Sequence, residues 1–442
     1  MMSVIKRFGL FIILQCYWHN SWAINLLDAY TMARDSDPAF IAAYYAHQAG
    51  QEYRVLGRAN LLPSVSASYT RYENSADIDF DNGQTSRSEQ RDYTSKNASV
   101  QLRQPLINFD AYARYKQGIA QTFMSDEEYA IREQELILRV FNRYAAVLYA
   151  QDMLALATMK KSAYAEQRQA DIYKFKHGES TKTDILESQS RFDLAEADIV
   201  EAMDNLNDAK AALNKIVGRP VDDITPLKER FELLPLEANK LENLQTLAAE
   251  QNVELKIQRY SLDVAKQDLN RGKAAHLPRL DGVMSWNNTV SDTTNTYNQE
   301  AVVKSLGVQL TVPIFSGGAA SAQVRQAQAK LFKAKAEFSD KTNQVLLELQ
   351  QQFNIVSNSK RKLTALTTAV NSAQLLVKAT KKSIKAGTRT TVDVLNAESQ
   401  FIEAKGDLLL ARYNYLQSYL NLKKVIGTLG INDLSAVSAQ FK

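Results

Sequence analysis

The chain is poor in the residue types from which catalytic and metal sites are built. It contains one cysteine, Cys16, and four widely separated histidines: His19, His47, His177 and His276. The sequence has no HExxH, GxSxG or glycine-rich phosphate-binding motif. These absences argue against an enzyme, a cofactor or a metal site. We expect His177 to be a solvated residue rather than a metal ligand.

The N-terminus carries the pattern of a secretory signal peptide. Lys6 and Arg7 precede the short apolar run 8–14, and small residues in the segment 21–23 mark a cleavage site. The apolar run is too short to span a membrane. We therefore expect residues 1–23 to be removed on export, in preference to forming an N-terminal core helix.

Cys16 offers an alternative, a lipid-modified cysteine. Gln15 is larger than the small residue expected before such a cysteine, so lipidation is disfavoured. After cleavage, the mature chain would hold no thiol for a disulfide or a metal. Loss of the two basic residues Lys6 and Arg7 would lower the formal net charge from +4 to +2, which gives no reason to expect nucleic-acid binding. No mature segment reaches about 18 uninterrupted apolar residues, so any membrane span would have to use β-strands.

The mature sequence contains an internal repeat with an offset of about 210 residues. Four short matches occur in the same order in both halves: 62–63 with 277–278, 100–105 with 308–313, 177–186 with 386–395, and 216–218 with 425–427. A period this long indicates a duplicated domain-sized unit rather than a solenoid. We expect the units at 24–219 and 241–427, a connector at 220–240, and a C-terminal segment at 428–442.

Each unit is expected to run helix, strand, strand, long helix, tip, long helix. Polar and apolar residues alternate in the strand regions, about 62–108 and 277–315, which predicts strands with one apolar and one polar face. The polar segments 73–96 and 287–300 within these regions are expected to be exposed loops.

Two long helical hairpins are expected at about 109–218 and 316–427. Apolar residues recur there at spacings of three and four, which is typical of a coiled-coil seam. One example is the series Ile137, Phe141, Tyr144 and Leu148. An ordinary globular bundle fits short windows equally well, but it does not account for two matched hairpins. The first helix, 24–60, is expected to restart at Asp37-Pro38, since proline fits the first position of a helix.

The two hairpins end in similar tips that contain glycine. Gly178 and Gly387 are expected to end the first helix of each hairpin, because glycine adopts the positive φ of a helix C-terminus without strain. Either Thr388 or Thr390 can then cap the helix that follows Gly387.

Four strands are too few to close a membrane barrel. About eight strands are the smallest number that closes a barrel filled by side chains, and a sheet in lipid cannot leave open edges. A membrane location therefore requires several copies of the chain. Their hairpins would form a ring of coiled coils that continues the strand barrel.

The sequence resembles the TolC family of outer-membrane channels over essentially the whole mature chain. The resemblance rests on the duplication and on three segments: PIFSGG at 313–318, AGTRTTVDVL at 386–395 and ARYNYL at 411–416. It implies an α+β membrane protein, a homotrimer in which each chain gives four strands to a β-barrel of roughly twelve. A long α-helical coiled-coil barrel would continue this barrel across the periplasm.

The same resemblance implies a passive exit duct of the cell outer membrane for multidrug efflux and type I protein secretion. The implied partners are outer-membrane lipid, a periplasmic adaptor (membrane fusion) protein, and an inner-membrane RND, ABC or MFS pump that supplies the energy. Two alternatives are a soluble periplasmic coiled-coil adaptor, which would explain the hairpins but not the strands, and an envelope enzyme with a helical scaffold.

The resemblance also implies a periplasmic gate at the tips. Arg389, Thr183 and Asp184 match positions that link neighbouring hairpins, and Asp393 matches one ring of acidic residues at the constriction. Without the resemblance, Arg389 and Asp393 would be a solvated surface pair one helical turn apart, worth about 0.3–0.5 kcal/mol.

Two positions depart from the family pattern. Asn396 stands where a second acidic residue is expected, and Ile384 replaces a tyrosine that makes a closing contact. The constriction is therefore expected to be less anionic, with fewer hydrogen bonds holding it closed. Gly178, Gly387 and Thr388 mark the tips at which the adaptor is expected to bind.

Overall fold

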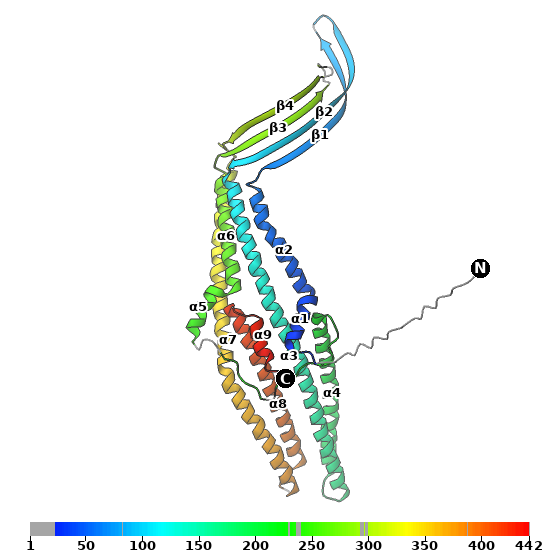
Figure 1. Ribbon diagram of the computed structural model, residues 1–442. Helices are drawn as coiled ribbons and strands as arrows, with labels where there is room; N and C mark the ends of the chain where they lie inside the picture. Colours follow the sequence, from blue (N-terminus) through cyan, green and yellow to red (C-terminus); the bar gives the residue numbers. More distant parts are fainter. Residues whose placement is uncertain are drawn as a thin grey trace, which may run out of the picture.

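The structure is a computed structural model that describes residues 23–81, 83–228, 230–235, 240–291, 296, 299–386 and 388–441. Residues 1–22 of the expected signal peptide, with Cys16, and the tip residue Gly387 lie outside the described residues. Figure 1 shows an elongated molecule with a four-stranded sheet at one end and two helical hairpin tips at the other. Among the described residues, no helix carries an apolar stretch of the length that a membrane span requires.

The two halves of the chain carry the same elements in the same order. The first half consists of α1 (Leu26–Ser36), α2 (Pro38–Ala59), β1 (Ser64–Asp81), β2 (Ser86–Ile107), α3 (Phe109–Lys176) and α4 (Lys182–Val217). The second half consists of α5 (Leu241–Gln251), α6 (Val253–Ala274), β3 (Arg279–Ser291), β4 (Gln299–Thr311), α7 (Ala319–Lys385) and α8 (Thr391–Ile426), followed by α9 (Ile431–Ser438). The matched helices are nearly equal in length, since α4 and α8 each have 36 residues and α3 and α7 have 68 and 67.

The four strands form one antiparallel sheet in the order β1-β2-β3-β4, so β1 and β4 lie at its edges. The pairing places apolar and polar side chains in alternating rows across the strands. One row contains Val65, Leu102, Met284 and Leu306, and the adjacent row contains Ser66, Gln101, Ser285 and Ser305. The prediction of one apolar and one polar face is therefore confirmed.

The prediction that 73–96 and 287–300 are loops is wrong for most of these residues. β1 runs to Asp81 and pairs with β2 along its whole length, and β3 and β4 likewise extend into the second segment. Backbone hydrogen bonds hold a hairpin together without an apolar face. Polar side chains then add cross-strand contacts, such as the one from Asn74 Nδ2 to Ser95 Oγ (3.1 Å).

Helices that are distant in the sequence meet end to end near the middle of the molecule. α1 ends at Ser36, and Asp37 caps α2 by accepting from the Ala39 N–H (3.1 Å), which confirms the predicted restart. The C-terminus of α4 abuts this restart, because the Ser36 hydroxyl donates to the Val217 carbonyl (2.8 Å). Gly218 then ends α4 with a φ of 78°.

The second half repeats this junction at Asn252. Its Oδ1 accepts from the Leu255 N–H at the start of α6 (2.9 Å), and its Nδ2 donates to the Val425 carbonyl at the end of α8 (2.7 Å). Gly427 ends α8 with a φ of 93°, and a Cβ at this position would lie 2.3 Å from the Gln251 carbonyl oxygen. One amide side chain thus satisfies backbone groups at two helix ends.

The core lies at the level of these junctions. The predicted seam residues of α3 are each at most 3% exposed, which confirms that prediction: Ile137, Phe141, Tyr144 and Leu148. The Tyr144 hydroxyl lies 3.0 Å from the carbonyl oxygens of both Ile24 and Thr225, so it ties the N-terminus and the connector to α3. The C-terminal segment forms α9, which packs on the same core together with α1 and α8.

Candidate functional site

A capping box at the start of α4 fixes the tip of the first hairpin. Gly178 follows α3 with a φ of 75°, as the sequence predicts. Thr181 accepts from the Asp184 N–H (3.2 Å), and the Asp184 carboxylate accepts in return from the Thr181 N–H (2.9 Å). These hydrogen bonds, above all the one from the Thr181 backbone, lower the pKa of Asp184. Asp184 is therefore held ionised within its own helical turn.

The second tip repeats this geometry. Thr390 caps α8, and the Asp393 carboxylate accepts from the Thr390 N–H (2.8 Å) and from its hydroxyl (2.9 Å). The other candidate cap, Thr388, instead donates its hydroxyl to the Ser383 carbonyl near the end of α7 (3.1 Å). The backbone hydrogen bond from Thr390 is the main cause that lowers the pKa of Asp393. Asp393 therefore carries its charge at neutral pH.

Arg389 and Asp393 form the surface pair that their spacing predicts. Nη1 of Arg389 lies 3.5 Å from Oδ1 of Asp393, and the two side chains are 59% and 35% exposed. Such an exposed pair contributes at most about 1 kcal/mol. Redirecting Arg389 toward another partner therefore costs little.

The other predicted gate residues are divided between the two hairpins. Thr183 is exposed in the first turn of α4, and Ile384 is half-buried near the end of α7. Asn396 on α8 reaches the first hairpin, where its Oδ1 accepts from Nη2 of Arg191 on α4 (3.2 Å). The position at which the family pattern expects an acid thus supplies a neutral acceptor to an arginine of the same chain.

A buried hydrogen bond behind the second tip joins the two hairpins and was not predicted. Thr391, the first residue of α8, donates its hydroxyl to Oδ1 of Asp171 on α3 (2.9 Å), and Asp171 is fully buried. Gln167 donates to the same oxygen (2.9 Å). Desolvation by burial raises the pKa of Asp171, and these hydrogen bonds oppose that rise. We call the contact between Thr391 and Asp171 the inter-hairpin bond.

The sequence did contain one signal for this contact. Asp171 lies one heptad after Tyr164, which is buried and packs with Ala195 of α4 and Leu395 of α8. Residues one heptad apart share a face of the helix. A carboxylate at a buried seam position therefore predicts that a polar group from a neighbouring helix forms a hydrogen bond with it.

The packing between the hairpins is open above the tips. A cavity of about 740 Å³ lies between α8 and the α3–α4 pair. Its lining includes Met153 and Leu156 of α3, Glu201 of α4, and Gly406 and Asp407 of α8. The two hairpins thus touch near the tips and at the core, and a gap lies between these two regions of contact.

Known proteins resemble this chain along nearly its whole length. The sequence profile described as "Outer membrane efflux protein" matches residues 29–219 and 244–428.

The chain belongs to the outer membrane efflux protein family.

Individual relatives agree with this assignment. The alkaline protease secretion protein AprF of Pseudomonas aeruginosa is 39% identical over 436 residues, which cover 98% of this chain and 90% of that protein. The outer membrane protein TolC of Vibrio cholerae is 30% identical over 428 residues, which cover 95% of this chain and 94% of that protein. The resemblance to the TolC family is therefore confirmed.

The fold agrees as well. The solved structure of the CmeC outer membrane channel of Campylobacter jejuni superposes with a TM-score of 0.78 at 14% identity, covering 97% of this chain and 92% of that chain. This efflux family member is an outer-membrane protein, as predicted. The family consists of efflux proteins rather than enzymes, and membership leaves no support for a soluble adaptor.

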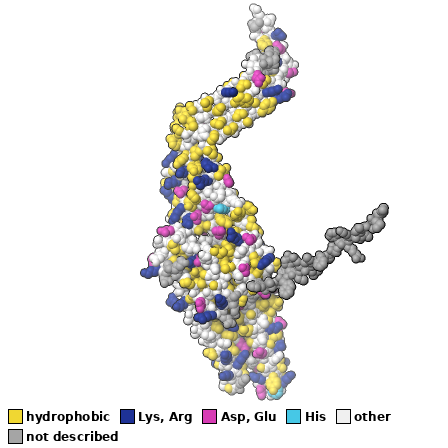
Figure 2. All heavy atoms as spheres, in the orientation of Figure 1, with side chains coloured by type: hydrophobic (Ala, Val, Ile, Leu, Met, Phe, Trp, Pro, Cys, Tyr) yellow, Lys and Arg dark blue, Asp and Glu magenta, His cyan; other side chains and the backbone are white. Residues whose placement is uncertain are grey.

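The sheet of this family member carries many exposed apolar side chains. Leu306 is 86% exposed, and Val65, Tyr69 and Val308 are also largely exposed. Figure 2 shows hydrophobic side chains in a broad band across the sheet, whereas the far end of the β1–β2 hairpin is mostly polar. The sheet therefore has a band suited to an apolar surrounding and an end suited to water.

Proposed function

We propose that three copies of this chain form an exit duct, in which each copy gives four strands to a barrel of roughly twelve. The observation that carries this proposal is the sheet, which has two edge strands and an exposed apolar face. In lipid, both edges need a partner. β4 of one copy pairs with β1 of the next until the ring closes, and the apolar band faces outer-membrane lipid.

The helices continue the duct through the periplasm. A continuous helix of 68 residues, such as α3, extends about 100 Å at 1.5 Å per residue. The duct is passive: an inner-membrane RND, ABC or MFS pump supplies the energy, and a periplasmic adaptor binds at the tips near Gly178, Gly387 and Thr388. The likeness to a protein named for alkaline protease secretion supports type I secretion of polypeptides, and the family description supports efflux.

The tips form the gate of this duct. Three ionised Asp393 side chains surround the axis, where a ring of carboxylates attracts cations and repels anions. In the closed state, Arg389 turns from its own Asp393 to Thr183 and Asp184 of the neighbouring copy. Its exposed and weak pairing within the chain supports this exchange.

Contacts between the two hairpins of the same chain compensate for the departures from the family pattern at the gate. Asn396 leaves the constriction with one acidic ring, and Ile384 cannot make the hydrogen bond of a tyrosine. The inter-hairpin bond between Thr391 and Asp171 and the contact between Asn396 and Arg191 instead hold the two hairpins of one chain together.

The first experiment tests the duct itself. Mass measurement in mild detergent is expected to give a trimer, and the same material is expected to conduct ions across a planar bilayer. A water-soluble, monomeric and non-conducting protein would overturn the proposal. In cells, deletion of the gene is expected to raise drug susceptibility and to lower protein secretion, and the wild-type gene is expected to restore both.

The second experiment tests the gate. Asp393→Asn is expected to lower the cation selectivity of the conductance and to weaken its block by multivalent cations, because the axial ring loses its charge. Asp193→Asn serves as the control, since Asp193 is exposed on α4 away from the tip. Equal behaviour of the two variants would remove Asp393 from the pore.

A further inference from the structure

The apolar face of the sheet ends at a single row of the β1–β2 hairpin. Three apolar pairs follow one another on this face: Val65 with Leu102, Ala67 with Val100, and Tyr69 with Ala98. The next pair on the same face is Arg71 with Lys96. Beyond it, this face carries only polar and charged side chains as far as the end of β1 at Asp81. We call Arg71 and Lys96 the boundary pair.

In a membrane, the boundary pair lies where the lipid tails give way to headgroups. Tyr69, two residues before Arg71, is 65% exposed on the apolar face, and aromatic side chains of membrane barrels gather where the apolar band meets water. Figure 2 shows Lys and Arg side chains where the hydrophobic band of the sheet meets the polar end of the hairpin. The charged groups of Arg71 and Lys96 are therefore placed to meet charged headgroups.

These headgroups belong to the outer leaflet. The helices join the sheet at the opposite end of the strands, since α2 ends at Ala59 and β1 begins at Ser64 (Figure 1). From Ser64 to Arg71 the strand rises about 23 Å at about 3.3 Å per residue, which is comparable with the apolar band of about 25 Å in a membrane barrel. With the helices in the periplasm, as proposed, Arg71 and Lys96 face the cell exterior. The outer leaflet of an outer membrane consists of lipopolysaccharide, a glycolipid that carries phosphate groups.

The boundary pair brings two like charges together. Paired residues of antiparallel strands have Cβ atoms about 4.5–5.5 Å apart, and like charges at this distance destabilise a sheet. Arg71 forms an exposed ion pair with Glu73 of its own strand (Nη2 to Oε1, 2.9 Å), which contributes little. Lys96 is exposed, forms no salt bridge with any residue that the structure describes, and pairs on β3 with the uncharged Val290. An anion bound between Arg71 and Lys96 would replace their repulsion with two attractions.

The neighbouring side chains favour an anion that is attached to a lipid. Asp77, Asp79 and Asp92 lie further along the same face, toward the far end of the hairpin, and they repel phosphate. On the other side of the boundary pair lie the apolar side chains, which stabilise only a ligand with an apolar part. A lipid whose acyl chains lie against the apolar face places its phosphate at Arg71 and Lys96.

We propose that Arg71 and Lys96 together bind a phosphate group of lipopolysaccharide in the outer leaflet. The planar guanidinium of Arg71 matches two phosphate oxygens, and the flexible side chain of Lys96 supplies a second positive charge. This inference rests on the proposed barrel in the outer membrane and adds a lipid-binding site on its outer surface. The bound lipid neutralises the repulsion within the boundary pair and so stabilises the β1–β2 hairpin.

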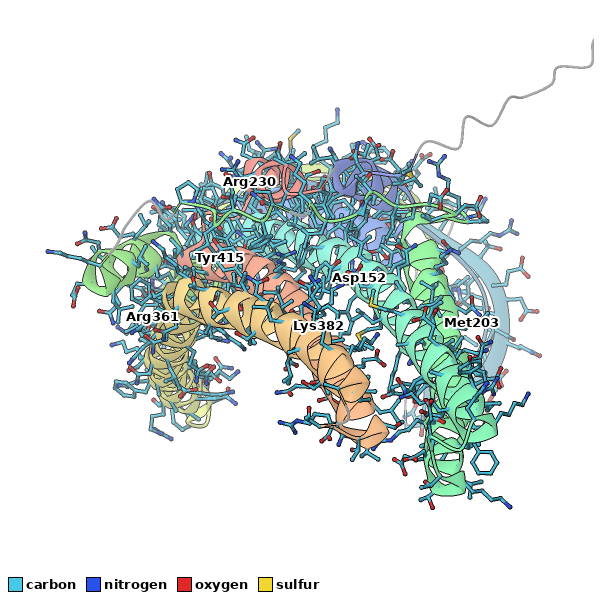
Figure 3. All side chains as sticks on the ribbon, turned by 90° about the horizontal axis from the view of Figure 1, so that it is seen from below. Asp152, Met203, Arg230, Arg361, Lys382 and Tyr415 are labelled. Carbon is cyan, nitrogen blue, oxygen red and sulfur yellow. The ribbon has the colours of Figure 1, made fainter. Side chains whose placement is uncertain are left out.

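Lipid binding by the purified protein in mild detergent tests the proposal. Arg71→Gln with Lys96→Gln, the boundary variant, is expected to bind purified lipopolysaccharide at least about tenfold more weakly than the wild type, because each basic residue at a lipid surface adds to the affinity. The control, Arg361→Gln with Lys382→Gln, changes two exposed basic residues of α7 near the tips (Figure 3). The control is expected to bind as the wild type does, and an equal affinity of the boundary variant would overturn the proposal.

Three probes identify the ligand. Lipopolysaccharide is expected to bind the wild type at least about tenfold more tightly than the same lipid after enzymatic removal of its phosphates. Neither inorganic phosphate nor phosphatidylglycerol is expected to displace it at equal concentration. Equal binding of the dephosphorylated lipid, or displacement by either of the other two probes, would show that the site does not select a phosphate of lipopolysaccharide and would overturn the proposal.

Thermal unfolding gives a second readout that a folding defect would not reproduce. Without lipid, the boundary variant is expected to keep or raise the unfolding midpoint, because it removes like-charge repulsion. Added lipopolysaccharide is expected to raise the midpoint of the wild type and the control by more than that of the boundary variant. A conducting trimer in which the lipid stabilises all three proteins equally overturns the lipid site alone, whereas a non-conducting monomer overturns the proposed function as well.

Discussion

Replacing Thr391 with valine removes the hydroxyl of the inter-hairpin bond and keeps the size of the side chain. In the wild type, this hydroxyl donates to the fully buried carboxylate of Asp171 at 2.9 Å. A buried hydrogen bond to a charged group contributes about 1.5–3 kcal/mol. If all of this energy holds the two hairpins together, its loss lowers the ratio of closed to open gate about 10- to 150-fold.

Single-channel recording in planar bilayers measures this ratio as an open probability. Thr391→Val is expected to raise the open probability, and Thr380→Val supplies the matched control. Thr380 is also buried, but its hydroxyl donates to the Leu376 carbonyl of its own helix (2.8 Å). An open probability that Thr391→Val leaves unchanged, or that both variants raise equally, would show that the inter-hairpin bond does not hold the gate.

Three further predictions concern pH and stability. Burial raises the pKa of Asp171 above its ordinary value of 3.8, so the closed state binds the proton more tightly than the open state does. The closed state should therefore become more stable as the pH falls through the raised pKa, and this gain should level off below pH 3.8. Recordings of the open probability of Asp171→Asn should not show this pH dependence. Gly427→Ala places a Cβ 2.3 Å from the Gln251 carbonyl oxygen at a φ of 93°, and the substitution should lower the free energy of unfolding by at least about 1–3 kcal/mol. It should lower the thermal unfolding midpoint more than the control Gly178→Ala does, because a Cβ at Gly178 would meet nothing within 4 Å. Tyr144→Phe removes the hydroxyl beside two buried carbonyls and should lower the same midpoint through a loss of about 1–3 kcal/mol.

The sequence predicted features that depend on a short stretch of chain. Spacings of three and four located the seam that buries Phe141 and Tyr144, because the period of a helix fixes which side chains share a face. Asp37-Pro38 predicted the restart of the first helix, since the cap and the proline act within one turn. Thr390 was predicted as one of two possible caps, and the choice between them needed the backbone geometry of the tip.

Features that depend on distant segments could not be predicted in this way. Asn252 joins the start of α6 to Val425, which follows 173 residues later, and no local pattern encodes such a partner. Asp171 stood out only as a polar residue on an apolar seam, and its partner Thr391 lies 220 residues away. The length of the β1–β2 hairpin could not be predicted from the sequence for another reason. Its ladder is made by backbone groups, which leave no periodic mark in a run of polar side chains.

The end-to-end helix junctions also set the order of events during biogenesis. Ser36 contacts Val217 across a separation of 181 residues, so the junction cannot form until nearly half of the chain has been delivered. Contacts with such separation form slowly, and a nascent chain emerges with its N-terminus first. The apolar faces of α1 and α2 therefore stay exposed to solvent at first, and the unfinished polypeptide needs protection from aggregation until its later helices can pack on them.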